Sequence, residues 1–193
     1  IDTAIVPDHE LRPYIHDYFK NIVVVRSALE LQKYVTAVPS IRCKRPVIVH
    51  APSDKNIKGT EYVLEAIARL EKEHELEFIL VHGVSHEQAK EMYQRADIIV
   101  DQILIGSHGI FAVEAMALGK PVICYIRDDL RETYPEGLPI VSANPYNFYA
   151  QLKSLVENPE LRYELGVKGR EYVEKYHDSL KIAYQLVELY KSL

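Results

Sequence analysis

Residues 97–126 read DIIVDQILIGSHGIFAVEAMALGKPVICYI, and this stretch indicates the fold class of the whole chain. It begins with an apolar run at 97–101, passes through a glycine-containing loop into a helical pattern at 110–118, and ends in a second apolar run at 121–126. A glycine and a proline stop the helical pattern, because glycine favours the left-handed conformation at a helix end and proline cannot continue a helix. Apolar runs of this length are typical of strands buried on both faces, so the stretch predicts a strand–helix–strand unit of a parallel sheet.

The same alternation extends over most of the chain. Short runs of apolar and β-branched residues predict further strands at 22–25, 47–50, 77–82 and 138–141. Helical patterns lie between them and fill the last third of the chain, at 60–74, 85–95, 145–157, 159–176 and 178–192. Ser85 and Gln88 have the spacing of a capping box at the start of one of these helices. The predicted fold is α/β: a Rossmann-like parallel sheet of about six strands, with helices on both faces and a helical C-terminal tail.

The composition excludes several classes of protein. With 48% hydrophobic and 26% charged residues, the chain matches an ordinary globular protein rather than a disordered or collagen-like one. Its net charge of −5, with the two signs well mixed, disfavours nucleic acid as a partner, since phosphate binding of that kind requires a basic surface. No repeat or linker divides the sequence, so residues 1–193 are predicted to form a single domain.

Several features bear on cellular location. Cys43 and Cys124 are the only cysteines and do not make a disulfide framework, which favours a reducing, cytoplasmic setting. No apolar run approaches the ~18 residues required to span a bilayer. The basic cluster at 42–45 is interpreted as a solvated loop, and the functional alternative is binding of lipid phosphate at the inner face of the membrane. Because the chain starts at Ile1 rather than Met, we expect it to be part of a longer protein.

Ligands of parallel α/β sheets bind outside the carboxyl ends of the strands, beside helix N-termini. The first junction of this kind, at 50–60, reads HAPSDKNIKGT. Lys58 stands just before a predicted helix, where its ammonium can reach an anion held at the strand ends, and Ser53 adds a hydroxyl to the same loop. The alternative for Lys58 is a solvated side chain at the end of a loop.

The second junction, at 101–121, combines glycines with the start of a helix. Glycines at 106 and 109 let the backbone approach a ligand closely. The N–H groups of Gly109, Ile110 and Phe111 are expected to point out of the helix start. Free donors in that position, together with the helix dipole, suit a diphosphate.

Other polar residues lie near these junctions. Glu114 follows one turn later on an otherwise apolar helix, where two ribose hydroxyls would satisfy its carboxylate; the alternative is a structural carboxylate that caps nearby N–H groups. Gly83, after the strand at 77–82, is expected to wall the base pocket. His82 and His86 lie on either side of this glycine and share no helix face, so no metal site is predicted there. The acids at 128–129 are expected to cap a helix at 130–134.

At the second junction the sequence resembles a known family. Residues 109–123, GIFAVEAMALGKPVI, look like the donor-site signature of group-1, or family-4, retaining glycosyltransferases with the GT-B fold. Lys58 and Gly59 resemble the lysine–glycine pair of that family, and residues 93–97, YQRAD, resemble the run that precedes the signature. The resemblance spans the whole chain. It implies one half of a GT-B fold: the C-terminal, nucleotide-sugar-binding domain of a two-domain enzyme, without its N-terminal acceptor domain.

The resemblance also implies roles for individual residues. Lys58 contacts the diphosphate of the donor, Glu114 contacts its ribose, and the amides at 109–111 hold the distal phosphate. The loop formed by Gly106, Ser107 and His108 faces the sugar. Lys58 and Glu114 are therefore the expected catalytic residues. No metal or other cofactor is expected where the lysine and the helix amides carry the charge that develops on the diphosphate.

One departure from the family pattern concerns the sugar. The family signature has a glutamate eight positions before Glu114, where this chain has Gly106. That glutamate normally touches the transferred sugar. Asp101, Gln102 and His108 are the candidates to replace it.

The sequence therefore predicts a glycosyltransferase of polysaccharide biosynthesis that transfers a sugar from a nucleoside-diphosphate sugar to an acceptor hydroxyl with retention. This chain would supply the donor site and be inactive alone, while the missing domain would bind the acceptor, a glycan or lipid-linked glycan. Two alternatives stay open. One is a nucleotide-sugar epimerase of the same fold, which would need its own acid and base at the sugar. The other is a non-catalytic nucleotide-sugar-binding module that has lost turnover together with the glutamate.

Overall fold

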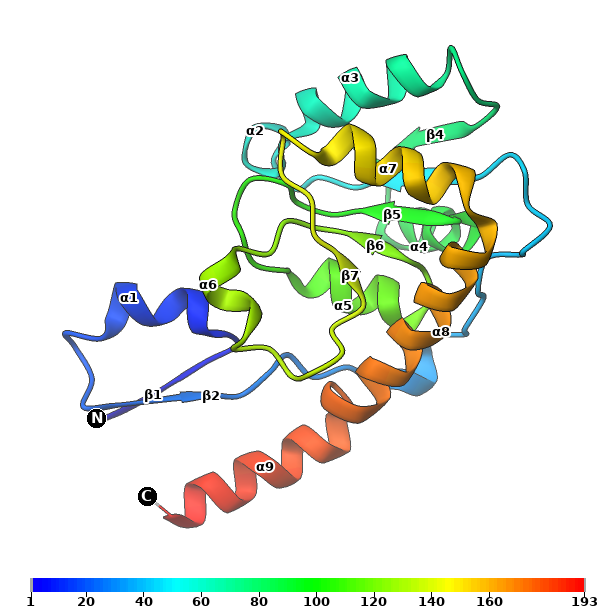
Figure 1. The fold of residues 1–193 in the computed structure, drawn as a ribbon. Coiled ribbons are helices and arrows are strands. Elements are labelled where there is room, and N and C mark those ends of the chain that lie inside the picture. Colours follow the sequence, from blue (N-terminus) through cyan, green and yellow to red (C-terminus); the bar gives the residue numbers. More distant parts are fainter. Residues whose placement is uncertain (1, 193) are drawn as a thin grey trace.

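Five strands form one parallel sheet, and two further strands form a separate parallel pair (Figure 1). The computed structural model describes residues 2–192, without the side chain of His86. The order in the larger sheet is β4-β3-β5-β6-β7, and neighbouring strands are parallel throughout. Its strands are β3 (Val47–His50), β4 (Glu77–Leu80), β5 (Ile98–Val100), β6 (Val122–Ile123) and β7 (Ile140–Val141).

Helices cover both faces of the larger sheet, as the sequence predicts. Helices α3 and α7 pack on one face, and α4, α5 and α8 pack on the other. Their bounds are α3 (Thr60–Leu70), α4 (His86–Arg95), α5 (Ile110–Ala117), α7 (Phe148–Glu157) and α8 (Pro159–Tyr176). Successive strand residues point to opposite faces, so Ile98 joins the core under α3 and α7 while Ile99 joins the core under α5 and α8. Both residues are fully buried, which explains the continuous apolar strands of the sequence.

The remaining helical segments are one long C-terminal helix and several short turns. Their bounds are η1 (His9–Leu11), α1 (Arg12–Ile15), η2 (Leu31–Lys33), α2 (Lys55–Lys58), α6 (Asp128–Arg131) and α9 (Ser179–Ser192). In Figure 1, α9 runs away from the larger sheet, on the same side of the molecule as the pair β1 and β2. No helix within residues 2–192 is both long enough and apolar enough to cross a membrane.

The strand predicted at 22–25 lies outside the larger sheet, so this sheet has five strands rather than about six. The run forms β2 (Asn21–Val24), which pairs in parallel with β1 (Thr3–Val6). None of the four residues of β2 is fully buried, whereas those of β5 all are. A β-branched run alone indicates a strand without naming its partner, and here the partner precedes it across the turns η1 and α1.

Hydrogen bonds tie the segment after β2 to the junction between α8 and α9. The amide of Leu29 donates to the His177 carbonyl at 2.8 Å, and the amide of Ser179 donates to the Leu29 carbonyl at 3.0 Å. The His177 ring adds a bond from Nδ1 to the Ser27 carbonyl at 2.8 Å. These contacts hold the β1–β2 pair beside the loops that leave the carboxyl ends of the larger sheet.

The local predictions for helix ends have mixed outcomes. The capping box is confirmed, because Ser85 and Gln88 exchange side-chain and backbone hydrogen bonds at the start of α4. The expected capping role of Asp128 and Asp129 is wrong, because both lie inside the first turn of α6 and Arg127 is the N-cap residue. Carboxylates in a first turn interact favourably with the helix dipole without capping the helix, and Asp129 also forms an ion pair with Arg127 at 2.8 Å.

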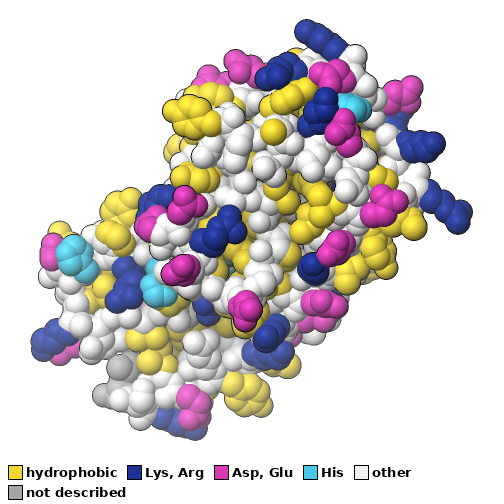
Figure 2. Space-filling view, in the orientation of Figure 1, with side chains coloured by type: hydrophobic (Ala, Val, Ile, Leu, Met, Phe, Trp, Pro, Cys, Tyr) yellow, Lys and Arg dark blue, Asp and Glu magenta, His cyan; other side chains and the backbone are white. Residues whose placement is uncertain are grey.

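Charged side chains of both signs are interspersed on the face shown in Figure 2. Lys and Arg side chains stand next to Asp and Glu side chains there, without a continuous area of one sign. Surface ion pairs of the protein include Lys153 with Glu73 and Lys168 with Glu164, both at 2.5 Å. Exposed pairs of this kind contribute little to stability, so the fold depends on the two apolar layers described above.

Candidate functional site

The carboxyl ends of β3 and β5 bring Lys58 next to Asp101 and Gln102. The two strands are neighbours and parallel, so the segments that follow them leave the sheet at the same edge. Lys58 ends the short helix α2, and its Nζ donates to Asp101 Oδ1 at 2.8 Å and to Gln102 Oε1 at 2.6 Å. The Lys58 side chain is 14% exposed and that of Asp101 only 1%, so water screens this ion pair weakly.

Asp101 also links Lys58 to the start of α5. Its second oxygen, Oδ2, accepts a hydrogen bond from the Gly109 amide at 3.3 Å. A β-carbon at Gly109 would lie 3.8 Å from Lys58 Nζ, so the ammonium sits directly beside the backbone at the helix start. Gly59 lets this loop pack closely, because a β-carbon there would come within 2.7 Å of the Ile103 side chain. This close packing explains why a glycine follows Lys58 in this chain.

The start of α5 presents backbone donors. Gly109 is the N-cap residue in an extended conformation and offers no side chain to cap the helix. No acceptor within the described residues bonds the amides of Ile110 and Phe111. Ile110 is 48% exposed, and the Phe111 ring packs against Tyr93 with centroids 4.9 Å apart. Two orphan amides, a lysine and the positive end of a helix dipole therefore meet at one edge of the sheet.

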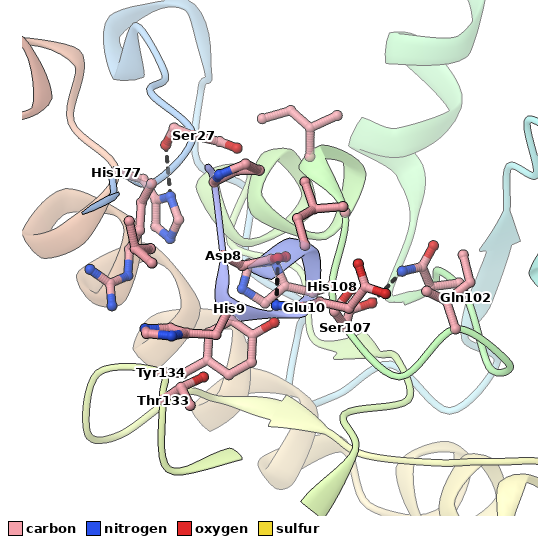
Figure 3. Close-up of a pocket in the computed structure, with 17 residues that line it drawn as sticks. Asp8, His9, Glu10, Ser27, Gln102, Ser107, His108, Thr133, Tyr134 and His177 are labelled. Atoms are coloured by element: carbon pink, nitrogen blue, oxygen red, sulfur yellow. Dashed lines mark hydrogen bonds between the residues drawn. The ribbon is translucent and has the colours of Figure 1, made fainter. Parts of the chain in front are cut away.

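A cavity of about 270 Å³ opens between the β1–β2 pair and this edge (Figure 3). Of the site residues predicted from the sequence, five line this cavity: Gln102, Ser107, His108, Gly109 and Ile110. The Gln102 amide donates to the Ser107 carbonyl and thereby holds the loop closed beneath the cavity. Segments remote in sequence complete the wall, namely residues 7–11, 24, 26–27, 133–134 and 177.

Gly106 does not line this cavity, and its backbone explains why the chain has glycine there. Its φ of +93° lies in the left-handed region, and a β-carbon would lie 3.2 Å from the Arg127 side chain. The amide of Arg127 donates to the Gly106 carbonyl at 2.8 Å, which fixes the two segments together. A side chain at position 106 would therefore strain the backbone, and the Arg127 side chain would have to shift by a few tenths of an ångström.

Glu114 lies in a different environment. Its Oε1 accepts a hydrogen bond from the Tyr34 hydroxyl at 2.8 Å. Both side chains line a second, smaller cavity of about 50 Å³ at α4 and α5, together with Lys33, Lys90, Tyr93, Gln94 and Leu118. Burial and the neighbouring Glu114 carboxylate raise the pKa of Tyr34 above its ordinary value, so the hydroxyl stays protonated and donates. The structure does not bring Glu114 into the larger cavity.

The two remaining predicted contacts are exposed. Ser53 lies in the loop after β3, and Gly83 lies in the loop after β4 with a φ of +69° and open space around it. Neither lines either cavity. Across residues 2–192, no cluster of three or more His, Cys, Asp or Glu could hold a metal. The side chain of His86, which the sequence pairs with His82, lies outside the described residues.

Sequence reasoning missed several residues that surround these sites. Tyr34 is 80 positions away from Glu114, and His177 reaches the larger cavity from the end of α8. Tyr134 reaches it from the segment after α6. None belongs to a motif, and only the tertiary fold brings them together.

Solved structures share this fold. Sucrose-phosphate synthase from Thermosynechococcus elongatus superposes with a TM-score of 0.77 at 19% identity, over 99% of this chain and 58% of that one. Anabaena Alr3699/HepE in complex with UDP-glucose superposes with a TM-score of 0.74 at 16% identity, over 100% of this chain and 64% of that one. The α/β fold with its five-stranded parallel sheet is thus that of GT-B glycosyltransferases.

Sequence comparison identifies the family. The family model described as "Glycosyl transferases group 1" matches residues 73–172, just over half of the chain, and the chain belongs to this family. It is also 25% identical over 179 residues to the MMP α-(1→4)-mannosyltransferase of Mycolicibacterium hassiacum. That alignment covers 78% of this chain and 44% of the mannosyltransferase, so the chain spans less than half the length of this relative.

Proposed function

We propose that this chain is the donor-binding domain of a retaining glycosyltransferase that uses a nucleoside-diphosphate sugar. The observation that carries the proposal is the junction of Lys58, Asp101 and the start of α5, where a cation and orphan amides converge. Family membership supplies the class of reaction. The Anabaena protein crystallised with UDP-glucose shares the fold, which supports a nucleotide sugar as the ligand.

The diphosphate is expected to bind at this junction. When the bond between the sugar and the diphosphate breaks, negative charge develops on the leaving phosphate. Lys58 and the amides of Ile110 and Phe111 would stabilise that charge, and a single preorganised donor contributes about 10²–10³ in rate in well-studied cases. Asp101 keeps Lys58 in position before the donor arrives and shares it with the phosphate afterwards.

Glu114 is the proposed contact for the ribose. Its carboxylate can accept hydrogen bonds from both ribose hydroxyls, and the ribose is proposed to take the place of the Tyr34 hydroxyl at Oε1. Ser53 and Gly83, both exposed on neighbouring loops, are proposed to lie at the entrance of the donor site.

The acceptor requires protein beyond this chain. The relatives described above are longer, and we propose that an N-terminal domain binds a glycan or lipid-linked glycan acceptor in polysaccharide biosynthesis. We propose no metal, because Lys58 and the amides of α5 already supply positive charge for the diphosphate. The free thiols of Cys43 and Cys124 support a cytoplasmic location, at the inner face of the membrane if the acceptor is lipid-linked.

Isothermal titration calorimetry of this chain with UDP, GDP and their sugars tests the proposal. We expect one nucleoside diphosphate to bind, and Lys58→Ala to weaken it about 10- to 100-fold through loss of charge-assisted hydrogen bonds. Lys55→Ala, which removes an exposed lysine from the same short helix, is the matched control and should bind as wild type. Lys58→Ala alone leaves the buried Asp101 carboxylate without its partner, which could itself weaken binding. The double variant Lys58→Ala, Asp101→Asn removes both charges, so weak binding by this variant reports the loss of Lys58 alone. Absence of binding to every nucleotide, or wild-type affinity in both Lys58 variants, would refute the proposal.

A non-catalytic nucleotide-sugar-binding module is the second candidate, and Gly106 favours it. The left-handed backbone at this position disfavours the glutamate of the family signature, and the Arg127 side chain would have to shift to admit it. Sugar transfer measured with the full-length protein separates the two functions. Donor binding without transfer to any glycan acceptor would establish the binding module.

A further inference from the structure

Unsatisfied polar atoms are concentrated in one aromatic cluster beside the larger cavity. Within the described part of the chain, six buried side-chain nitrogen or oxygen atoms have no hydrogen-bond partner. Four of them belong to this cluster: His108 Nδ1, Tyr134 OH, Tyr172 OH and His177 Nε2. The ring centroids of His108 lie 4.8 Å from Tyr134 and 6.2 Å from His177. A buried polar group without a partner is costly, so such a concentration indicates a place that a polar ligand completes.

Three of the four side chains line the cavity, as Figure 3 shows for His108, Tyr134 and His177. They come from the loop before α5, the segment after α6 and the junction between α8 and α9. The fourth, Tyr172, packs against His177 with centroids 5.9 Å apart but does not line the cavity. The cluster therefore contains three side chains that border the cavity and one matched side chain behind them.

The orientation of the His177 ring is fixed. The residue is 1% exposed, and its Nδ1 bonds the Ser27 carbonyl at 2.8 Å. A carbonyl only accepts, so Nδ1 carries the proton. Burial lowers the pKa of His177 to about 4, so the ring is neutral at pH 7 and its Nε2 is an acceptor. An acceptor at this position suits a hydroxyl group that donates to it.

The other two groups are also uncharged at neutral pH. Burial lowers the pKa of His108 below its ordinary value and raises that of Tyr134 above it, so the imidazole is neutral and the phenol keeps its proton. Neutral groups that donate or accept match hydroxyls, which do both, better than they match a phosphate. The cavity, about 270 Å³, lies near the small end of the range for ligand pockets, which begins at about 300 Å³. That size suits one sugar ring rather than a whole nucleotide.

We propose that His177, Tyr134 and His108 form the sugar subsite and hydrogen-bond the hydroxyls of the transferred sugar in place of the glutamate that Gly106 replaces. This inference rests on the proposed donor function. Continuity supports it, because the same cavity is lined by Gln102 and Gly109, which lie beside the diphosphate junction. The specificity for the sugar would then reside in side chains from three separate segments rather than in the signature loop.

Nuclear magnetic resonance of the imidazole nitrogens gives the first test, on this chain with UDP, UDP-glucose, GDP and GDP-mannose. We expect the Nε2 resonance of His177 to move with one nucleotide sugar and to stay in place with the matching nucleoside diphosphate. Two isosteric variants give the second test by calorimetry. Tyr134→Phe should weaken binding of the nucleotide sugar about three- to ten-fold, which is the contribution of one hydrogen bond. It should leave the affinity for the nucleoside diphosphate unchanged. Tyr172→Phe, which removes an equally buried hydroxyl outside the cavity, should change neither.

The outcomes separate this inference from the donor function. If a nucleoside diphosphate binds but neither sugar moves the His177 resonance, the sugar subsite is refuted and the donor function stands. The same conclusion follows if Tyr134→Phe and Tyr172→Phe have equal effects. If no nucleotide binds, both proposals fail together.

Discussion

The hydrogen bond between Tyr34 and Glu114 provides a sharp test of the role of this glutamate. We propose that a ribose bound to Glu114 takes the place of the Tyr34 hydroxyl, which lies 2.8 Å from Oε1. The bond therefore opposes nucleotide binding by its own strength. Tyr34→Phe deletes the hydroxyl, keeps the ring in the small cavity and removes that opposition. A purely structural carboxylate at Glu114 predicts no such gain in affinity.

The magnitude follows from the environment of the bond. Hydrogen bonds to charged groups contribute about 1.5–3 kcal/mol. Glu114 and Tyr34 are only partly buried, and water can replace part of the lost bond, so we expect about 1–2 kcal/mol here. The variant should therefore lose about 1–2 kcal/mol of unfolding free energy and bind the nucleoside diphosphate about 5- to 30-fold more tightly.

Chemical denaturation and calorimetry measure the two effects in the same samples. Tyr93→Phe is the control, since Tyr93 lines the same cavity and its hydroxyl has no hydrogen-bond partner within residues 2–192. It should change neither stability nor affinity by more than a few tenths of a kcal/mol. A Tyr34→Phe variant that loses stability while binding nucleotide with unchanged affinity would refute the displacement of Tyr34 by the ribose.

Two further predictions concern stability. Gly106→Ala should lower the free energy of unfolding by about 1–2 kcal/mol because of its positive φ, and by more because Arg127 must move. Gly137 has a φ of +83° and open space around it, so Gly137→Ala is the control and should lose only the backbone contribution. Thermal unfolding measures both. The second prediction concerns His177, whose pKa is lowered from 6.5 to about 4 in the folded protein. The unfolded chain therefore binds the proton more readily. The stability that this residue provides above pH 6.5 is lost as the pH falls toward 4. Between pH 7 and 5 this residue should contribute a loss of about 2 kcal/mol, which urea titrations of His177→Phe should no longer show.

Most of the fold could be predicted from local patterns in the sequence. The segment that contains α5 and β6 was predictable because periodicity, a terminating glycine and a following proline all lie within it. The capping box at Ser85 was predictable for the same reason. The pairing of β2 with β1 was not, because a β-branched run does not name its partner and both strands lie outside the layered core.

The site divides in the same way. The approach of Lys58 to the end of β5 follows from the rule that neighbouring parallel strands end at one edge of the sheet. Nothing in the sequence indicated that Asp101 would be the residue that binds the Lys58 ammonium. The bond from Tyr34 to Glu114 spans 80 positions, and the cavity joins five segments of the chain. Such contacts depend on how separate elements pack, which the periodicity of any one of them does not encode.

The arrangement also explains how the charged side chains of a donor site can be paired in the absence of a donor. Lys58 bonds Asp101 and Gln102, and Glu114 bonds Tyr34, so both charged side chains proposed to bind the nucleotide already have internal partners. Binding then exchanges internal bonds for ligand bonds, which lowers affinity for any anion that supplies only one of them. His177 and Tyr134 lack internal partners at the atoms proposed to meet the sugar, so contacts there would cost no exchange. Each hydrogen bond to the sugar should therefore contribute more to affinity than a bond from Lys58 to the diphosphate, and the ratio of nucleotide-sugar to nucleotide affinity measures the subsite directly.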